Sequence, residues 1–285
     1  MHPALSNLID ALEPIPVGEG VYRARQPNDN GGHLFGGQVL AQALAAANRF
    51  VVDGLANSLH AYFLSRGNSH DPIDFGVAEL RHSRTFQTVE VTATQAGTRI
   101  LKLAVSYHAT EPGPTHQIPM DDVGPPRGET YERALLRVMT PAGFEEDAMP
   151  FELPVEIRGV GGVGLFNSEI NPPQARCWMR MRDVLPDDPG LHQCLFAYSS
   201  DYAIMAPALN PHPLPVTSLQ SASLDHAIWF HREFKMDEWL LFELDSPVAH
   251  GARGIGRGLL YTREGALVAT CVQEGLLRPL RETKS

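Results

Sequence analysis

Two long stretches of the chain contain no Asp, Glu, Lys or Arg, and each is followed by segments in which apolar and polar residues alternate. In the first stretch, residues 31–48, apolar side chains recur every three or four positions and are separated by Ala, Gly and Gln. A helix without a charged face is a buried helix, so this stretch predicts one that other elements surround. From residue 57 the pattern changes to an alternation rich in Val, Thr, Ile and aromatic residues, which predicts long antiparallel strands with a hairpin turn at Gly97.

The same order of elements returns in the last third of the chain. An extended run begins at residue 175, a short apolar helical segment occupies residues 195–209, and several strands follow, with a hairpin turn at Gly265. The segment between the halves is rich in Pro and Gly and contains one helical pattern, ETYERALLRVM. We therefore predict an α+β protein with an N-terminal unit at residues 1–110, a linker carrying a surface helix at 111–174 and a C-terminal unit at 175–285.

Composition narrows the classes of partner. The net charge of -10 argues against nucleic acid or an anionic membrane as the main partner. The three cysteines are far apart and form no CxxC pair, so they are expected to be free thiols in a reducing compartment. The first twenty residues do not have the pattern of a secretory signal, and neither uncharged stretch is continuously apolar over the length that a bilayer requires. We expect a cytoplasmic protein with no integral membrane association.

The stretch from Ser199 to Phe230 contains only two charged residues, Asp201 and Asp225. Such a composition is not that of solvated surface, so a carboxylate here needs an explanation. In one interpretation, Ser200 or Asp201 caps the start of a short apolar helix by accepting its first amide protons. In the other, the Asp201 carboxylate holds a reacting water molecule at a buried helix end, where a low dielectric strengthens polar contacts.

Several separated blocks carry a more specific signal. They are FGGQVLAQAL and LHAYFLSRGNSHDPIDFGVAELRHSRTF in the first half, and YSSDYAIMAPAL, SASLDHAIWFHREFKMDEWLLFELDSPVAHGARG and GLLYTREGALVATCVQEGLLR in the second. In this order the blocks resemble the acyl-CoA thioesterase II family of bacteria and peroxisomes, from about Val21 to Arg278. The resemblance implies a double hotdog fold, in which two buried helices are each wrapped by an antiparallel β-sheet and the sheets join into one. It also implies hydrolysis of fatty acyl-CoA to a free fatty acid and CoA.

The resemblance assigns three residues of the C-terminal unit to catalysis. In the family an Asp, a Thr or Ser and a Gln bind the attacking water, and these positions fall on Asp201, Ser223 and Gln273. Asp201 could then act as the general base, while the neutral groups of Ser223 and Gln273 orient the water. Exposed amides at a helix start, near Gly36 and Gly37 or after Asp201, could hold the thioester oxygen. This chain has Ser where bacterial relatives have Thr, so the hydroxyl is kept and the methyl group that fixes its rotamer is lost.

Other polar residues are weaker candidates. His60 could line the substrate pocket, although a satisfied buried histidine is about as plausible. Arg66 and Arg84 could meet the phosphates of CoA, or could be ordinary surface charges. Adjacent residues of a strand point to opposite faces, so Asp225 and His226 cannot readily share a proton, and we interpret both as structural.

Alternative chemistries find little support in the chain. It has neither the GxSxG sequence of α/β-hydrolases nor an HExxH zinc motif, and no metal or separate cofactor is expected because CoA is part of the substrate. The remaining alternatives are a hotdog enoyl-CoA hydratase and a non-catalytic acyl-CoA binding module. The hydratase resemblance requires a His five residues after the Asp, where this chain has Ala206. Exposed edges of hotdog sheets favour pairing, so we expect a homodimer or higher homo-oligomer.

Overall fold

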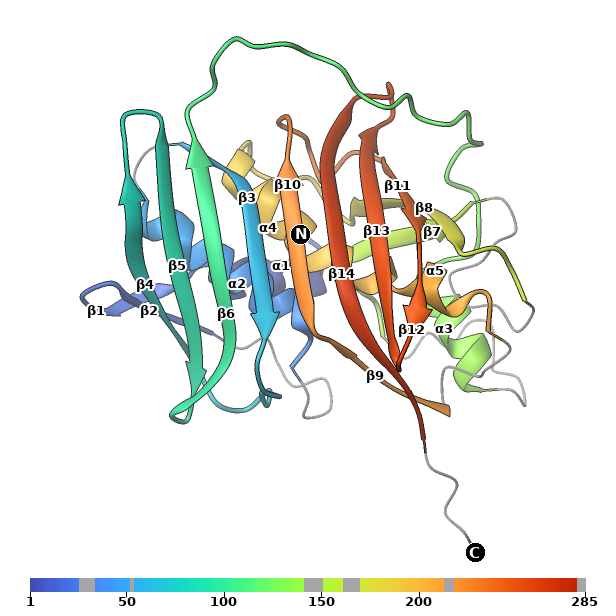
Figure 1. The fold of residues 1–285 in the computed structure, drawn as a ribbon, viewed down its shortest axis with the longest axis horizontal. Coiled ribbons are helices and arrows are strands. Elements are labelled where there is room, and N and C mark those ends of the chain that lie inside the picture. The colour runs from blue at the N-terminus through green and yellow to red at the C-terminus, as the bar shows by residue number, and fades with distance from the viewer. Residues whose placement is uncertain (26–33, 52–53, 141–150, 161–169, 213–217, 281–285) are drawn as a thin grey trace, which may run out of the picture.

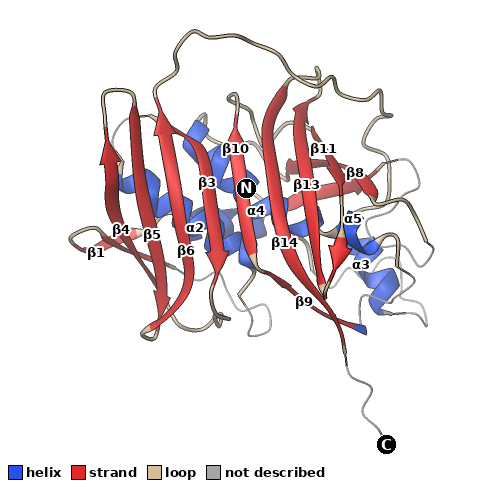
Figure 2. Cartoon of the chain, in the orientation of Figure 1, coloured by secondary structure: helices blue, strands red, loops and turns tan. Residues whose placement is uncertain are grey.

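A computed structural model describes residues 1–25, 34–51, 54–140, 151–160, 170–212 and 218–280. In these ranges one antiparallel sheet of 14 strands has its main helices on one face (Figures 1 and 2). The helices are α1 (Pro3–Ala11), α2 (Gly36–Phe50), α3 (Tyr131–Met139), α4 (Pro189–Ala203) and α5 (Ala206–Leu209). The strands of the first half are β1 (Ile15–Gly18), β2 (Val21–Ala24), β3 (Leu55–Phe63), β4 (Ile73–His82), β5 (Phe86–Gln95) and β6 (Thr98–His108). The others are β7 (Val155–Gly159), β8 (Gln174–Met181), β9 (Leu219–Ser223), β10 (Asp225–Phe230), β11 (Leu240–Asp245), β12 (Ala249–His250), β13 (Arg253–Thr262) and β14 (Leu267–Pro279).

The sheet consists of two copies of one topology. In space the first half runs β2-β4-β5-β6-β3 beside α2, and the second half runs β8-β11-β13-β14-β10 beside α4. The inner edges of the two halves are β3, which follows α2, and β10, which follows α4, α5 and β9. These two strands pair antiparallel and make the sheet continuous. The predicted hairpin turns are present, with Gly97 and Gly265 at φ 80° and 87°. The α+β double hotdog fold is therefore confirmed.

The two central helices run antiparallel across the sheet (Figure 1). The start of α2 contacts the end of α4, where the Gly37 amide donates to Asp201, and the end of α2 contacts the start of α4, where Asn48 lies 3.7 Å from the Cys194 sulfur. Asn48 also accepts from the Tyr107 hydroxyl at 2.7 Å. Asn48 lies twelve residues after Gly36, the first residue of α2, and Asp201 lies twelve residues after Pro189, the first residue of α4. The two side chains therefore occupy matching positions in the two copies.

Glycines in β13 allow the end of α4 to approach the sheet closely. A Cβ atom on Gly256 would lie 1.9 Å from the backbone oxygen of Ile204, so only glycine fits there. The neighbouring arginine, Arg257, donates to Asp245 at 2.7 Å on the exposed side of the sheet. GARGIGRG is therefore a close-packed strand segment.

The segment between the halves contains the helix predicted for it and also a strand that the sequence analysis did not predict. Thr130 caps α3, while β7 pairs antiparallel with β8 at the edge of the sheet. The sequence of β7, VEIRG, is short and is surrounded by Pro and Gly, which explains why no strand was predicted. Earlier in the segment, Gly124 accepts from the Trp178 indole at 2.9 Å, so this part of the chain covers the outer face of the second half. No helix in the described ranges is long and apolar enough to span a membrane.

Candidate active site

Asp201 lies in the last turn of α4, not at the start of a helix as one interpretation of the sequence had it. The start of α4 is capped by Asp188, which accepts from the Gly190 amide at 2.9 Å. The half-buried Asp201 carboxylate instead reaches the first turn of α2, where its Oδ2 accepts from the Gly37 amide at 2.8 Å. The first turn of a helix exposes amide protons and carries a positive partial charge, both of which stabilise a carboxylate. Asp201 of the second copy therefore caps the helix of the first copy.

Ser223 and Gln273 lie beside this carboxylate. The Ser223 hydroxyl, at the end of β9, donates to Asp201 Oδ1 at 3.0 Å. Gln273 in β14 donates from Nε2 to the Ser223 oxygen at 3.0 Å and is only 1% exposed. The structure thus brings the three predicted residues into one hydrogen-bonded chain, whose outer end is half-buried and whose inner end is closed off from solvent.

His226 extends the chain inward, although the sequence analysis interpreted it as structural. Its Nδ1 is hydrogen-bonded to Gln273 Oε1, and its Nε2 lies 3.1 Å from the Ser200 hydroxyl. The side chain is fully buried, and this burial lowers the pKa of His226. Asp225 points away, as predicted, and accepts from the Glu274 amide at 2.7 Å. A search for polar residues that share a face with Gln273 on the adjacent strand would have found His226, because β10 pairs with β14.

The first two residues of α2, Gly36 and Gly37, have no room for a side chain. A Cβ atom on Gly36 would lie 2.9 Å from Asp201 Oδ2, and one on Gly37 would lie 2.4 Å from the backbone oxygen of Tyr198. The structure thus brings both predicted glycines to the carboxylate. The Gly37 amide is already bonded to Asp201, which leaves the Gly36 amide as the better candidate to hold a substrate oxygen.

Aromatic side chains form a wall beside the carboxylate. Phe35 stacks on Tyr202 with ring centroids 4.4 Å apart, and the Tyr198 and Tyr202 hydroxyls lie 2.7 Å from each other. Tyr131, from the start of α3, packs edge-on against Tyr202. Burial raises the pKa of Tyr198 to about 12 and, helped by the charge of Asp201, also raises the pKa of Tyr131 and of Tyr202. These phenols are therefore neutral at physiological pH and provide a largely apolar surface.

Three predicted binding residues lie elsewhere. His60 is exposed on the face of β3 that points away from the helices, and its ring packs edge-on against Trp229 at 5.1 Å. It is therefore not in a pocket with Asp201, and it is not a buried histidine either. Arg66 is exposed in the loop after β3, at the same end of the sheet as Asp201. Arg84 is exposed in the turn between β4 and β5, which flanks the opposite end of β3.

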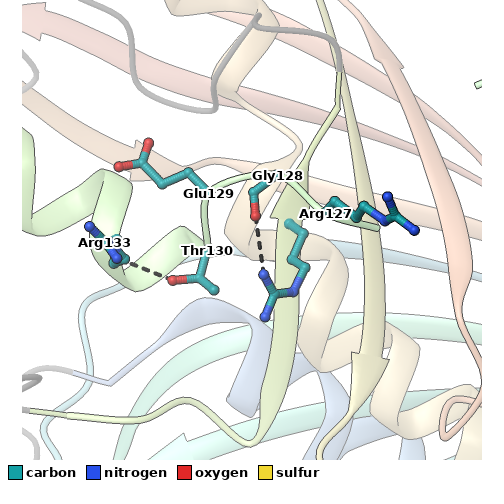
Figure 3. Close-up of a pocket in the computed structure, with 6 residues that line it drawn as sticks. Arg127, Gly128, Glu129, Thr130 and Arg133 are labelled. Atoms are coloured by element: carbon teal, nitrogen blue, oxygen red, sulfur yellow. Dashed lines mark hydrogen bonds between the residues drawn. The ribbon is translucent and has the colours of Figure 1, made fainter. Parts of the chain in front are cut away.

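An open cleft lies at the start of α3, and the residues that line it do not belong to the Asp201 chain (Figure 3). Its lining comes from the linker and from β7, namely Arg127, Gly128, Glu129, Thr130, Arg133 and Arg158. The Arg158 guanidinium donates to the Gly128 carbonyl at 3.2 Å and to Glu156 at 2.6 Å, so it holds the linker against β7. Across the described ranges, no group of three or more His, Cys, Asp or Glu side chains is placed to bind a metal ion.

Comparisons with known proteins agree with the fold. Residues 24–109 match the model of the acyl-CoA thioesterase N-terminal domain, and residues 145–276 match that of the acyl-CoA thioesterase family. Acyl-CoA thioesterase 2 of Haemophilus influenzae is 35% identical over 98% of this chain and 99% of its own length. Acyl-coenzyme A thioesterase 8 of Mus musculus is 36% identical over 92% of this chain and 86% of its own length.

Solved structures agree with the fold and the family indicated by these sequence comparisons. The crystal structure of an acyl-CoA thioesterase II from Mycobacterium marinum has a TM-score of 0.79 and 33% identity, and the match covers 99% of this chain and all of that one. A hot dog protein of Alicyclobacillus acidocaldarius, with 17% identity and a TM-score of 0.76, supports the fold alone. Since both halves match family models and the relatives align over nearly the whole chain, the chain belongs to the acyl-CoA thioesterase II family.

Proposed function

We propose that the protein hydrolyses fatty acyl-CoA to a free fatty acid and CoA, using a water molecule held by Asp201, Ser223 and Gln273. The observation that carries the proposal is the chain of two 3.0 Å hydrogen bonds from Gln273 through Ser223 to the Asp201 carboxylate. This chain ends at the half-buried Asp201 carboxylate beside the first turn of α2. A water molecule can reach the carboxylate there, and the amides of the helix start can stabilise a developing negative charge.

In the proposed reaction, a water molecule beside Asp201 and Ser223 loses a proton to the Asp201 carboxylate and attacks the thioester carbon. The tetrahedral intermediate carries a negative charge on the former carbonyl oxygen. We assign its stabilisation to the Gly36 amide and to the positive end of α2, since the Gly37 amide is engaged by Asp201. The carbon–sulfur bond then breaks, and the CoA sulfur takes the proton back from Asp201. No covalent acyl-enzyme is required.

The test is a thiol-release assay on Asp201→Asn, with Asp225→Asn as the matched control. Both substitutions exchange a carboxylate for an amide, but within the described residues the Asp225 carboxylate accepts from the Glu274 backbone amide and not from Ser223 or Gln273. We expect Asp201→Asn to lower kcat by roughly 10²–10⁴-fold, the typical contribution of a general base, while acyl-CoA binding persists. Unchanged turnover in Asp201→Asn would contradict the proposal.

The same assay separates the alternatives. Hydration of an enoyl-CoA leaves the thioester intact, and a binding module turns nothing over, so neither releases a free thiol. Ala206, at the position where the hydratase resemblance requires His, is buried in α5 and has no acid–base group.

A further inference from the structure

Five side chains form one unbroken series of hydrogen bonds that leads inward from the carboxylate. In order they are Asp201, Ser223, Gln273, His226 and Ser200. Four of them, all except Asp201, are neutral groups that both donate and accept, so the direction of every bond depends on its neighbours. The positions of the heavy atoms alone do not decide between the two possible directions.

Asp201 decides the direction. A carboxylate only accepts, so Ser223 must donate its single hydroxyl proton to Oδ1. The Ser223 oxygen is then an acceptor towards Gln273, which must present its Nε2 amide. The carbonyl Oε1 of the same amide consequently faces His226, whose Nδ1 must carry the proton.

The far end of the series allows this direction. With its proton on Nδ1, neutral His226 has an acceptor at Nε2, and the Ser200 hydroxyl lies 3.1 Å away as its donor. Ser200 has a second acceptor, the Ala197 carbonyl at 3.2 Å, so it can also serve if the direction is reversed. The inner end therefore tolerates both directions, and only the Asp201 end enforces one.

We propose that His226 is a positioning residue for the thioesterase reaction, whose Nδ1–H holds the Gln273 carbonyl and so keeps the Gln273 amide directed at Ser223. The inference rests on the proposed function, because it assigns a task to the support of Gln273. Without an Nδ1 donor, Gln273 Oε1 loses its partner in this series, and the amide is held in the series only by its bond to Ser223. The amide could then rotate by half a turn and present an acceptor to Ser223, which would compete with Asp201 for the Ser223 proton.

The burial of His226 fits this task. The ring is inaccessible to solvent and lies between α4 and β14, so water cannot replace either partner. Burial lowers its pKa from the ordinary value of 6.5, so the ring is neutral at physiological pH and has one donor and one acceptor. Which of the two ring nitrogens carries the proton is then set by the hydrogen bonds of the series.

The first test compares two substitutions of the same residue. His226→Asn places an amide near the position of Nδ1 and can still donate to Gln273, whereas His226→Leu has a similar volume and cannot donate. We expect His226→Leu to lower kcat by roughly tenfold, the effect of one lost hydrogen bond, with KM nearly unchanged, and His226→Asn to recover most of the loss. Urea unfolding of both variants provides the control for general destabilisation. Equal kcat losses in two folded variants would overturn the proposal.

The second test reads the tautomer directly and needs no turnover. In ¹⁵N-histidine-labelled protein at about pH 8, the ring nitrogens of His226 are assigned by their absence in His226→Asn. We expect a protonated Nδ1 and an unprotonated Nε2 in the wild type. The opposite tautomer would overturn the proposal.

Asp201→Asn sharpens this measurement. The Gly37 amide is a fixed donor, so the introduced carboxamide must turn its oxygen to Gly37 and its NH₂ group to Ser223. Ser223 then donates to Gln273, Gln273 donates to Nδ1, and the proton of His226 moves to Nε2, with Ser200 donating to Ala197. An unchanged tautomer in Asp201→Asn would refute the coupling, whereas absence of thiol release in the wild type would refute the proposed function and leave the tautomer result standing.

Discussion

Gly37→Ala perturbs the contact between the two copies of the fold where the start of α2 meets the end of α4. The added Cβ would lie 2.4 Å from the backbone oxygen of Tyr198, whereas ordinary contact begins at 3.4 Å. Backbone cannot rotate away as a side chain can, so the start of α2 and the end of α4 must separate by about 1 Å along this contact. The Gly37 amide, now 2.8 Å from Asp201 Oδ2, would move to roughly 3.8 Å, beyond the limit of a hydrogen bond.

The expected cost follows from these distances. Losing a hydrogen bond to a charged group costs roughly 1.5–3 kcal/mol, and alanine in a helix returns at most about 1 kcal/mol relative to glycine. We therefore expect the free energy of unfolding to fall by roughly 0.5–2 kcal/mol, although alanine is the better helix former. Catalysis should suffer more, because a 1 Å displacement of a reacting group can cost about 10²-fold in rate.

Urea unfolding followed by circular dichroism measures the first effect, and thiol release from acyl-CoA measures the second. Gly76→Ala in β4 is the control, because there the nearest atom to the added Cβ is a backbone oxygen at 4.0 Å. A Gly37→Ala variant with the unfolding midpoint and kcat of the wild type would show that the contact between α2 and α4 does not position Asp201.

Three further predictions concern Ser223, Arg84 and the buried histidines. Ser223→Ala removes the donor to Asp201 and the acceptor of Gln273, so kcat should fall by roughly tenfold or more in the thiol-release assay. Ser223→Thr keeps the hydroxyl and should match or exceed the wild-type kcat, and an inactive Thr variant would contradict the role of the hydroxyl. Arg84→Ala should leave KM for acyl-CoA unchanged, since Arg84 lies at the end of β3 opposite Asp201; a raised KM would refute this. Burial lowers the pKa of His192 and His226 below 6.5, so the unfolded chain binds more protons than the folded chain just below that pH. The contribution of these two histidines to the free energy of unfolding should therefore be full above pH 6.5 and be lost as the pH falls below it. Urea unfolding midpoints between about pH 8 and 5 measure this loss, and a midpoint that rises on acidification would contradict the prediction.

The repeated helix and sheet could be predicted from the sequence because an element buried on one face has apolar residues at regular intervals, every three or four positions in a helix and every second position in a strand. It also identified Asp201, Ser223 and Gln273, but through resemblance, since nothing local to any of them indicates their approach across 72 residues of chain. The helix end occupied by Asp201 was not predictable from its own neighbours. Which amide a carboxylate caps depends on how α2 and α4 are packed together, and that is a tertiary property.

Other sequence-based interpretations failed for related reasons. His60 and His226 lie in similar short sequences, LHAYF and LDHAIWF, yet one is exposed and the other is buried. A shift of one residue in a strand moves a side chain to the opposite face, so a loose sequence correspondence does not determine which face a residue occupies. β7 is recognisable as a strand through its pairing with β8 and its bridge to Thr130, which are contacts between distant parts of the sequence.

Because Asn48 and Asp201 occupy matching positions in the two copies of the fold, the Asn48 corner can be compared with the proposed catalytic site. Each stands at the end of a central helix, beside the start of the other, but the Asn48 carboxamide has no basic oxygen and is already bonded to Tyr107. At these two matching positions, one copy of the fold has a carboxylate and the other has a carboxamide. The general base that we propose therefore has no counterpart at Asn48, whose carboxamide instead contacts Tyr107 of β6 and Cys194 of α4.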